Sequence, residues 1–177
     1  MLHLYGRTLE RIGALERAFG VSLIFLIVGA ITLQVFTRYA LNRPIAWVEE
    51  SATYAFIWSV FVGASLGLKQ GRHIVIETFH FALGPRVAAA LRLVIWLLVL
   101  TMLVVLVVQG FKVMGVEGRS KTISLPIEIP RMWFYSVPLT YAAASMAFTT
   151  VYLILLELQA LGGRLRDPSA SPLPGLR

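Results

Sequence analysis

The residues whose types could support chemistry are few, and they lie at the margins of long apolar stretches. There are three histidines, His3, His73 and His80, and one adjacent pair of carboxylates, Glu49 and Glu50. Haem ligation would require imidazoles at membrane depth, and a zinc site would require more ligands than His73 and His80 supply. A proton relay would require ionisable groups inside the apolar stretches. The chain offers none of these, and it has no cysteine for a thiolate site. We therefore expect a protein that is not an enzyme and that binds no metal ion or cofactor.

The carboxylate pair belongs to the run Trp47-Val48-Glu49-Glu50, near the start of an apolar segment. At a helix N-terminus two carboxylates complement the helix dipole, and a tryptophan beside them suits the membrane interface. A second interpretation is that one carboxylate points inward and pairs with a basic group such as Arg38. Adjacent helical residues point about 100° apart, so both carboxylates cannot face the same neighbour.

Four apolar segments must position these residues. The chain has 177 residues, of which 58% are apolar and 14% are charged, against about 25% charged residues in a soluble domain. About 20 helical residues span the ~30 Å hydrocarbon layer, and four such helices in a soluble fold would leave nothing to cover them. The sequence therefore predicts an all-α integral membrane protein. We expect one domain over residues 1–161, with transmembrane helices at about 18–38, 44–68, 86–111 and 132–157, and a mobile tail over 162–177.

The distribution of basic residues predicts the orientation of these helices. Four crossings put both termini on one side, and the segments on that side carry ten Lys and Arg residues against six on the other. The positive-inside rule therefore places both termini in the cytoplasm. The formal net charge of +7 is then a signal of topology, and no stripe of basic and aromatic residues indicates a nucleic-acid partner.

Segments beside the predicted spans are expected to lie on the membrane surface. Residues 5–16 place apolar side chains at helical spacing and predict a short amphipathic helix, and the mixed segment 69–83 predicts a second interfacial stretch. Lys69, Arg72 and His73 mark the inner end of the second span, where we expect contact with anionic lipid headgroups. Membrane lipids are therefore expected partners.

The outer connections carry further polar residues and prolines. Arg38 and Asn42 lie in or beside the first, tight connection, where Asn42 is a candidate cap for the second span. Residues 112–131 form a longer connection that contains glycines and prolines. Pro138 then falls about two turns into the fourth span, where a proline can kink a helix.

Small residues recur at every fourth position of the second span, at Ser51, Ala55, Ser59, Gly63 and Gly67. Such a row lets another helix approach closely in lipid. The row can pack against another span of this chain or against a separate protein, and the sequence leaves both alternatives open. The third span is almost entirely Leu, Val and Ile, which suits contact with lipid.

Several of these motifs together resemble a known family, the small membrane subunit of tripartite ATP-independent periplasmic (TRAP) transporters, or DctQ-like family. The likeness covers roughly residues 15–157, and a second outer loop that ends in Ile129-Pro130 fits the same pattern. Leu139 departs from it, because the family often has glycine after the preceding proline, which leaves the local bend of the fourth span open. The motifs are Arg38-Tyr39, Asn42, Trp47-Val48-Glu49-Glu50, Trp58, Phe61-Val62-Gly63-Ala64 and Gly71-Arg72-His73-Ile74.

The resemblance implies a subunit of a three-part uptake system in the bacterial inner membrane. A soluble periplasmic protein captures an organic acid, and a large membrane subunit carries it inward with sodium. The small subunit is then a multi-pass, non-catalytic scaffold that anchors the large one. We expect the interface with these partners at Arg38, Asn42, Trp47, Glu49, Glu50, Ser59, Gly63 and Gly67, and lipid contact at Arg72 and His73.

Two other classes of membrane protein remain as alternatives. An autonomous small oligomeric channel or exporter would need polar groups near the membrane midplane, and the four predicted spans contain no ionisable side chain in their interiors. A membrane anchor of a respiratory enzyme would need intramembrane histidines or a quinone site. The sequence therefore favours a helper subunit over a carrier.

Overall fold

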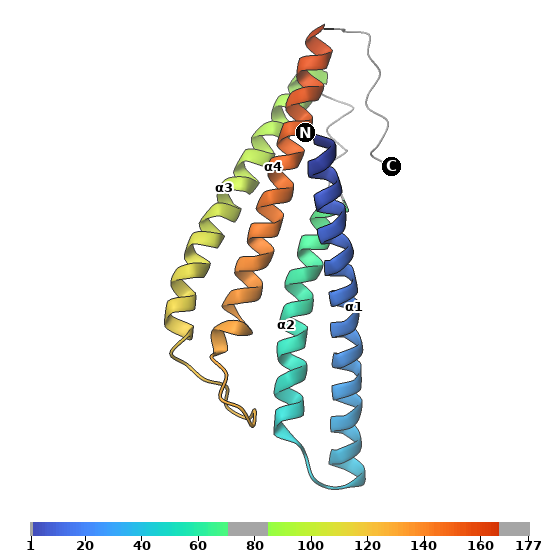
Figure 1. The fold of residues 1–177 in the computed structure, drawn as a ribbon, viewed down its shortest axis with the longest axis vertical. Helices are drawn as coiled ribbons and strands as arrows, with labels where there is room; N and C mark the ends of the chain where they lie inside the picture. Colours follow the sequence, from blue (N-terminus) through green and yellow to red (C-terminus); the bar gives the residue numbers. More distant parts are fainter. Residues whose placement is uncertain (1, 71–84, 167–177) are drawn as a thin grey trace.

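The computed structural model describes residues 2–70 and 85–166, which form four long helices and one short 3-10 helix (Figure 1). All four long helices are long and apolar enough to cross a membrane. This confirms the predicted all-α membrane fold for the part of the chain that is described. The helices are α1 Leu2–Ala40, α2 Ala46–Lys69, α3 Pro85–Glu117 and α4 Ser136–Arg166, with the 3-10 helix η2 at Arg131–Trp133 just before α4.

Two helical hairpins, α1–α2 and α3–α4, lie against each other through α2 and α4 (Figure 1). The spatial order is therefore α3, α4, α2, α1, with α1 also contacting α4. In their most apolar windows α2 and α4 bury 33% and 28% of the residues, whereas α1 and α3 bury 6% each. The two central helices thus form the core, and the two flanking helices present apolar surface to lipid, as predicted for the third span.

The first helix is continuous, so the expectation of a separate amphipathic helix over 5–16 is wrong. Its buried residues Leu9, Gly13, Glu16 and Leu23 recur at helical spacing along one line. These buried residues face α2 and α4. A break in the helix after residue 16 would take the residues on one side of the break out of contact with these two helices. Tyr5 fixes the first turns on α4, since its hydroxyl donates to the Phe148 carbonyl oxygen at 2.8 Å and the two rings stack.

The ends of α3 and α4 differ from the predicted ones. The third helix continues to Glu117 and the fourth begins only at Ser136, so Pro138 lies in the first turn of α4 and does not kink it. Proline suits that turn because the backbone N–H that it lacks would have no partner there. The fourth helix runs on to Arg166, past the predicted boundary at 161, and residues 167–177 of the predicted tail lie outside the described residues.

In the described residues, the α3–α4 hairpin is held by a close helix crossing, by an ion pair and by a hydrogen bond from the Ser136 hydroxyl to the Glu117 carboxylate. A Cβ atom on Gly110 would lie 2.2 Å from Thr140 Oγ1, so only glycine permits the observed approach of α3 to α4. Toward the other end of the hairpin, Arg92 Nη2 lies 2.7 Å from Glu157 Oε1. The third helix is therefore in close contact with α4 alone among the long helices described.

We predict that Gly110→Ala destabilises the α3–α4 hairpin, because the new methyl group would force the helices apart at a typical cost of about 1–3 kcal/mol for overpacking. Thermal unfolding in detergent should show a lower midpoint than wild type. Gly115→Ala is the matched control, because a Cβ atom there meets nothing within 4 Å. Equal midpoints for the two variants would contradict the close crossing.

Candidate functional site: two polar clusters on the central helix

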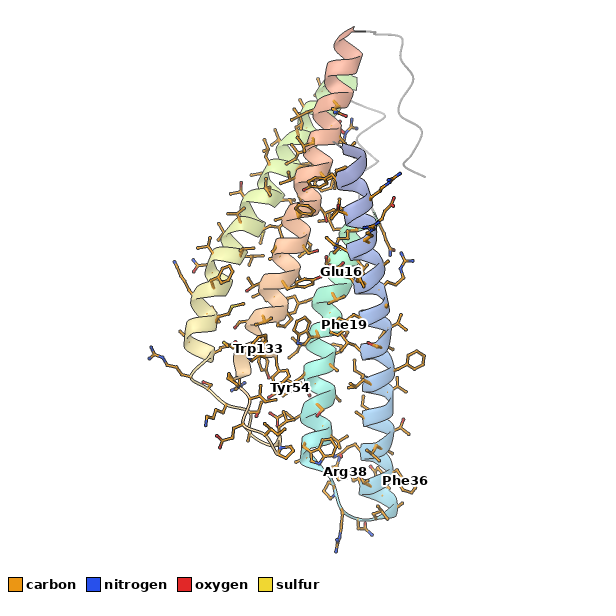
Figure 2. All side chains as sticks on the ribbon, viewed as in Figure 1. Glu16, Phe19, Phe36, Arg38, Tyr54 and Trp133 are labelled. Carbon is orange, nitrogen blue, oxygen red and sulfur yellow. The ribbon has the colours of Figure 1, made fainter. Side chains whose placement is uncertain are left out.

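A buried ion pair joins α1, α2 and α4. Glu16 on α1 is 3% exposed, and its carboxylate oxygen Oε2 lies 2.6 Å from Lys69 Nζ on α2 (Figure 2). Three hydroxyls complete the surroundings of this carboxylate: Ser145 donates to Oε1 at 2.9 Å, Tyr141 at 3.0 Å and Ser65 at 3.1 Å. We call these five residues the Glu16 cluster.

The Glu16 cluster is fully hydrogen-bonded, which is the condition under which a buried charge pair is tolerated. Lys69 Nζ also lies 2.7 Å from Ser145 Oγ and 3.2 Å from Ser65 Oγ, so the ammonium has partners on two helices besides Glu16. The lysine stem passes close to α1, since a Cβ atom on Gly13 would lie in van der Waals contact with Lys69 Cδ at 3.7 Å. Lys69 is therefore an internal residue, and the expectation that it contacts lipid headgroups is wrong.

A second cluster ties the opposite end of α2 to the loop between α3 and η2. The Glu50 carboxylate accepts hydrogen bonds from the backbone N–H groups of Ser124 at 2.6 Å and Ile123 at 3.2 Å. It also accepts one from the Tyr54 hydroxyl, one turn along α2. We call Glu50 and Tyr54 with these two N–H groups the Glu50 cluster. The predicted pairing with Arg38 is wrong for Glu50, because the loop supplies its donors.

The loop that Glu50 holds is itself ordered as a small hairpin. Lys121 and Pro130 form an isolated β-bridge, and the Thr122 N–H donates to the Ile129 carbonyl oxygen at 3.0 Å. Lys121 also pairs with Glu128 across the hairpin, and this hydrogen bond holds the pKa of the Glu128 carboxyl below its ordinary value. The connection is thus shorter than the predicted range 112–131, because the first residues of that range belong to α3.

Aromatic side chains pack beside the Glu50 cluster and extend the contact between α2 and the start of α4. The Tyr54 ring stacks on Phe134 with centroids 4.0 Å apart, and it meets Tyr135 edge to face. Trp58 Nε1 donates to the Trp133 carbonyl oxygen at 3.1 Å (Figure 2). The second helix is therefore fixed at both ends, by Glu50 at one and by Lys69 at the other.

Arg38 and Glu49 lie elsewhere, on the walls of an open groove between α1 and α2. The groove has a volume of about 410 Å³. Among the described residues neither side chain has an ion-pair or hydrogen-bonding partner. Trp47 lies beside them at the start of α2 and is 45% exposed. The pairing of a carboxylate with Arg38 is therefore not formed by Glu49 either.

Asn42 closes the end of α1, and the expectation that it caps α2 is wrong. It adopts a φ of 49°, the left-handed conformation that asparagine tolerates better than most residues. The Arg43 N–H then returns to the Thr37 carbonyl oxygen at 3.1 Å. The N-cap of α2 is Ile45, which has no capping side chain, and its N–H donates to Gln34 Oε1 at 3.3 Å.

The row of small residues on α2 divides between two faces. Ala55 is buried in the core, whereas a Cβ atom on Gly63 or Gly67 would meet nothing within 4 Å. Ser59 turns its hydroxyl back to the Phe56 carbonyl oxygen of its own helix. A spacing of four residues advances 400° per step, so a row from 51 to 67 drifts by about 160° around the helix. Packing within the chain is therefore the wrong alternative for Gly63 and Gly67.

Two predicted site residues lie outside the described part of the chain, and several residues of the Glu16 cluster were not predicted. Arg72 and His73 belong to the segment 71–84, which is not described. Glu16, Tyr141 and Ser145 were not predicted from the sequence as members of a site. A signal was present in the spacing, since Ser65 and Lys69, like Tyr141 and Ser145, are four residues apart and face the same neighbour on a helix.

Comparison with known proteins places the sequence of this chain in one family. Residues 27–160 match the family described as tripartite ATP-independent periplasmic transporters, DctQ component. The chain belongs to the DctQ family. The sialic acid TRAP transporter small permease protein SiaQ of Vibrio cholerae is 28% identical over 127 residues, which cover 66% of this chain and 73% of that protein. The C4-dicarboxylate small permease protein DctQ of the same organism is 35% identical over 81 residues, which cover 44% of this chain and 35% of that protein.

The family match and the fold together define the kind of protein. This DctQ chain is a small permease subunit of a TRAP transporter, and it is a multi-pass protein of the bacterial inner membrane. The matched region begins within α1 and ends within α4, so it takes in the whole Glu50 cluster and all members of the Glu16 cluster except Glu16 itself. The resemblance stated from the motifs is thereby confirmed.

We predict that Lys69→Met strongly destabilises this DctQ subunit, because it leaves the Glu16 carboxylate buried without its counter-ion, at a typical cost of about 3–5 kcal/mol. Unfolding in detergent with increasing denaturant measures the change. The double variant Glu16→Gln with Lys69→Met should recover a large part of the loss. The control is Lys121→Met, whose partner Glu128 is 70% exposed, so its effect on the free energy of unfolding should be small. A double variant no more stable than Lys69→Met would contradict the coupling.

We predict that Glu50→Gln loosens the hairpin over 119–130, because the uncharged amide offers one acceptor oxygen where the carboxylate offers two. Hydrogen–deuterium exchange at the Ile123 and Ser124 amides should become faster by about tenfold, the equivalent of ~1.4 kcal/mol. Glu49→Gln, one residue away and without a partner among the described side chains, should leave this exchange unchanged. The same rate in both variants would show that the carboxylate does not hold the loop.

Proposed function

We propose that this DctQ subunit is a static, non-transporting scaffold that anchors the large membrane subunit of its TRAP transporter. The observation that carries the proposal is the double fixation of α2. The Glu16 and Glu50 clusters lie about 28 Å apart along that helix, at ~1.5 Å per residue, near opposite edges of a ~30 Å hydrocarbon layer. A helix held by charged groups at both edges resists sliding and tilting, as a fixed scaffold must.

The polar groups of the two clusters also argue against a transport path through this chain. A carrier needs polar groups that exchange between the protein and its cargo. In the described residues no buried side-chain nitrogen or oxygen atom lacks a hydrogen-bonding partner. Glu16 and Lys69 pair with each other and form hydrogen bonds with neighbouring hydroxyls. Their charges therefore stabilise the fold and are not free to bind a transported solute.

The substrate class follows from the relatives. The two related permease proteins are named for sialic acid and for C4-dicarboxylates, and both kinds of molecule carry a carboxylate. We propose that the system served by this chain takes up an organic acid with sodium, delivered by a periplasmic binding protein. The count of basic residues, ten against six, supports cytoplasmic termini. The turn over 41–45 and the loop over 118–130 would then face the periplasm, where that binding protein can reach them.

The exposed face of α2 is the surface that we assign to the large subunit. This face carries Glu49, Phe56, Gly63 and Gly67, which lie within about 40° of one another's direction at 100° per residue. It belongs to a central helix, yet Phe56 is 58% exposed and the two glycines meet no neighbour. Glycines let a partner helix approach closely in lipid. The indole of Trp47 and the turn at Asn42 flank this face at one end.

Reconstitution in liposomes tests the proposed role. The large subunit and the binding protein of the same system are combined with this chain, and uptake of labelled organic acids is measured with and without a sodium gradient. We expect uptake with all three proteins and the gradient, none from this chain alone, and a loss when it is left out. Flux through the isolated chain would instead support an autonomous channel or exporter.

We predict that Gly63→Leu reduces co-purification of the large subunit by at least fivefold, because a leucine would hold the partner helix away from α2. The control is Gly29→Leu on α1, where a Cβ atom also meets nothing within 4 Å. Both variants should fold normally, as shown by unchanged thermal unfolding of the isolated chain. A normal yield of complex with Gly63→Leu would remove this face of α2 from the interface.

A further inference from the structure

The groove between α1 and α2 combines apolar walls with two charges of opposite sign at one end. Ile27, Ile31 and Phe56 supply apolar surface along the groove, while Arg38 and Glu49 stand near the end that carries the α1–α2 turn. The lining has two further polar side chains: Gln34 accepts the Ile45 N–H at Oε1, and Thr53 donates its hydroxyl to the Glu49 carbonyl oxygen. Arg38 and Glu49 are therefore the charged groups of this groove that remain available to an occupant.

The length of the groove matches one leaflet of a membrane. From Ile27 to Arg38 the wall formed by α1 extends about 16 Å at ~1.5 Å per residue, and half of the ~30 Å hydrocarbon layer is about 15 Å. Its charged end thus falls at the depth of lipid headgroups and its apolar part at the depth of acyl chains. An occupant with the same division, a charged head and a chain of one leaflet's length, is a phospholipid.

The dimensions of the groove suit a lipid chain. It lies between two adjacent helices of one hairpin and has a volume of about 410 Å³, which can admit one narrow acyl chain. Ala30 and Ala52 keep the groove open, because larger side chains at these lining positions would fill it.

We propose that this groove binds a phospholipid whose headgroup carries both a phosphodiester and a primary ammonium. The Arg38 guanidinium is suited to the phosphate, where it can donate two parallel hydrogen bonds, and the Glu49 carboxylate is suited to the ammonium. A headgroup with phosphate and glycerol satisfies Arg38 but gives Glu49 no cation. A headgroup with a quaternary amine gives Glu49 a cation without N–H donors. The zwitterionic primary-amine lipid therefore complements both charges. The groove shares Glu49 and Phe56 with the face of α2 assigned to the large subunit, so the bound lipid would lie at the edge of that interface.

Native mass spectrometry of the full-length chain in detergent tests this inference. The probes are phosphatidylethanolamine, phosphatidylglycerol and phosphatidylcholine with identical acyl chains, added in competition. We expect phosphatidylethanolamine to bind at least fivefold more tightly than the other two. Glu49→Gln should abolish this preference, whereas Arg38→Gln should weaken all three lipids. Glu10→Gln and Arg119→Gln, which remove exposed charges outside the groove, are the matched controls and should leave the preference intact.

The apolar part of the groove has its own test. Ala30→Leu should lower the affinity for all three lipids by narrowing the groove, and Thr53→Leu, on the opposite wall and exposed, provides a second variant if the first fails to fold. Equal binding of the three lipids by the wild-type chain, or unchanged binding by both leucine variants, would overturn the proposal. The chain has no cysteine, so Thr53→Cys gives a single thiol for cross-linking. Efficient cross-linking to the large subunit, without a lipid preference, would assign the groove to that protein instead.

Discussion

The interaction on which the rest of the structure depends is the ion pair between Glu16 and Lys69. Two charges removed from water are costly, and the cost is offset only when both are completely hydrogen-bonded. Here the partners come from α1, α2 and α4, because Tyr141 and Ser145 supply hydroxyls to Glu16. The pair therefore specifies which helices must meet and at what height along their axes. Apolar packing alone cannot do this in lipid, where the tails compete equally for every apolar face.

Glu50 imposes the second constraint, and the two together explain why four helices form a layer and not a closed bundle. The loop that Glu50 holds comes from the α3–α4 hairpin, so this carboxylate brings α4 against α2 at one end while the Glu16 cluster does so at the other. Among the long helices described, α4 alone places the third helix, through Gly110 and the Arg92–Glu157 pair. The consequence is a central helix, α2, with one face in the core and one face open.

The sequence predicted the four helices, because apolar length is a property of each segment by itself. It failed where the outcome depends on a neighbour distant in sequence. Lys69 was assigned to lipid because its partner Glu16 lies on another helix. One carboxylate of the Glu49–Glu50 pair was interpreted as a partner of Arg38, because the backbone donors that bind Glu50 carry no sequence signal. The row from Ser51 to Gly67 was treated as one face, although a period of four drifts around a helix of 3.6 residues per turn. Gly110, which does permit a close crossing, stood alone and belonged to no row.

Five charges on α1 and α2 thus fall into two classes with different physical consequences. Those of Glu16, Lys69 and Glu50 are satisfied within the chain, and each fixes one helix against another. Those of Arg38 and Glu49 border a groove and have no partner among the described residues. Because α1 and α2 carry these charges in their last and first turns, the helix dipoles already offset part of the cost of leaving them unpaired. In the described residues, a framework of internally satisfied charges with Arg38 and Glu49 left at a surface groove supports the proposal of a static scaffold subunit.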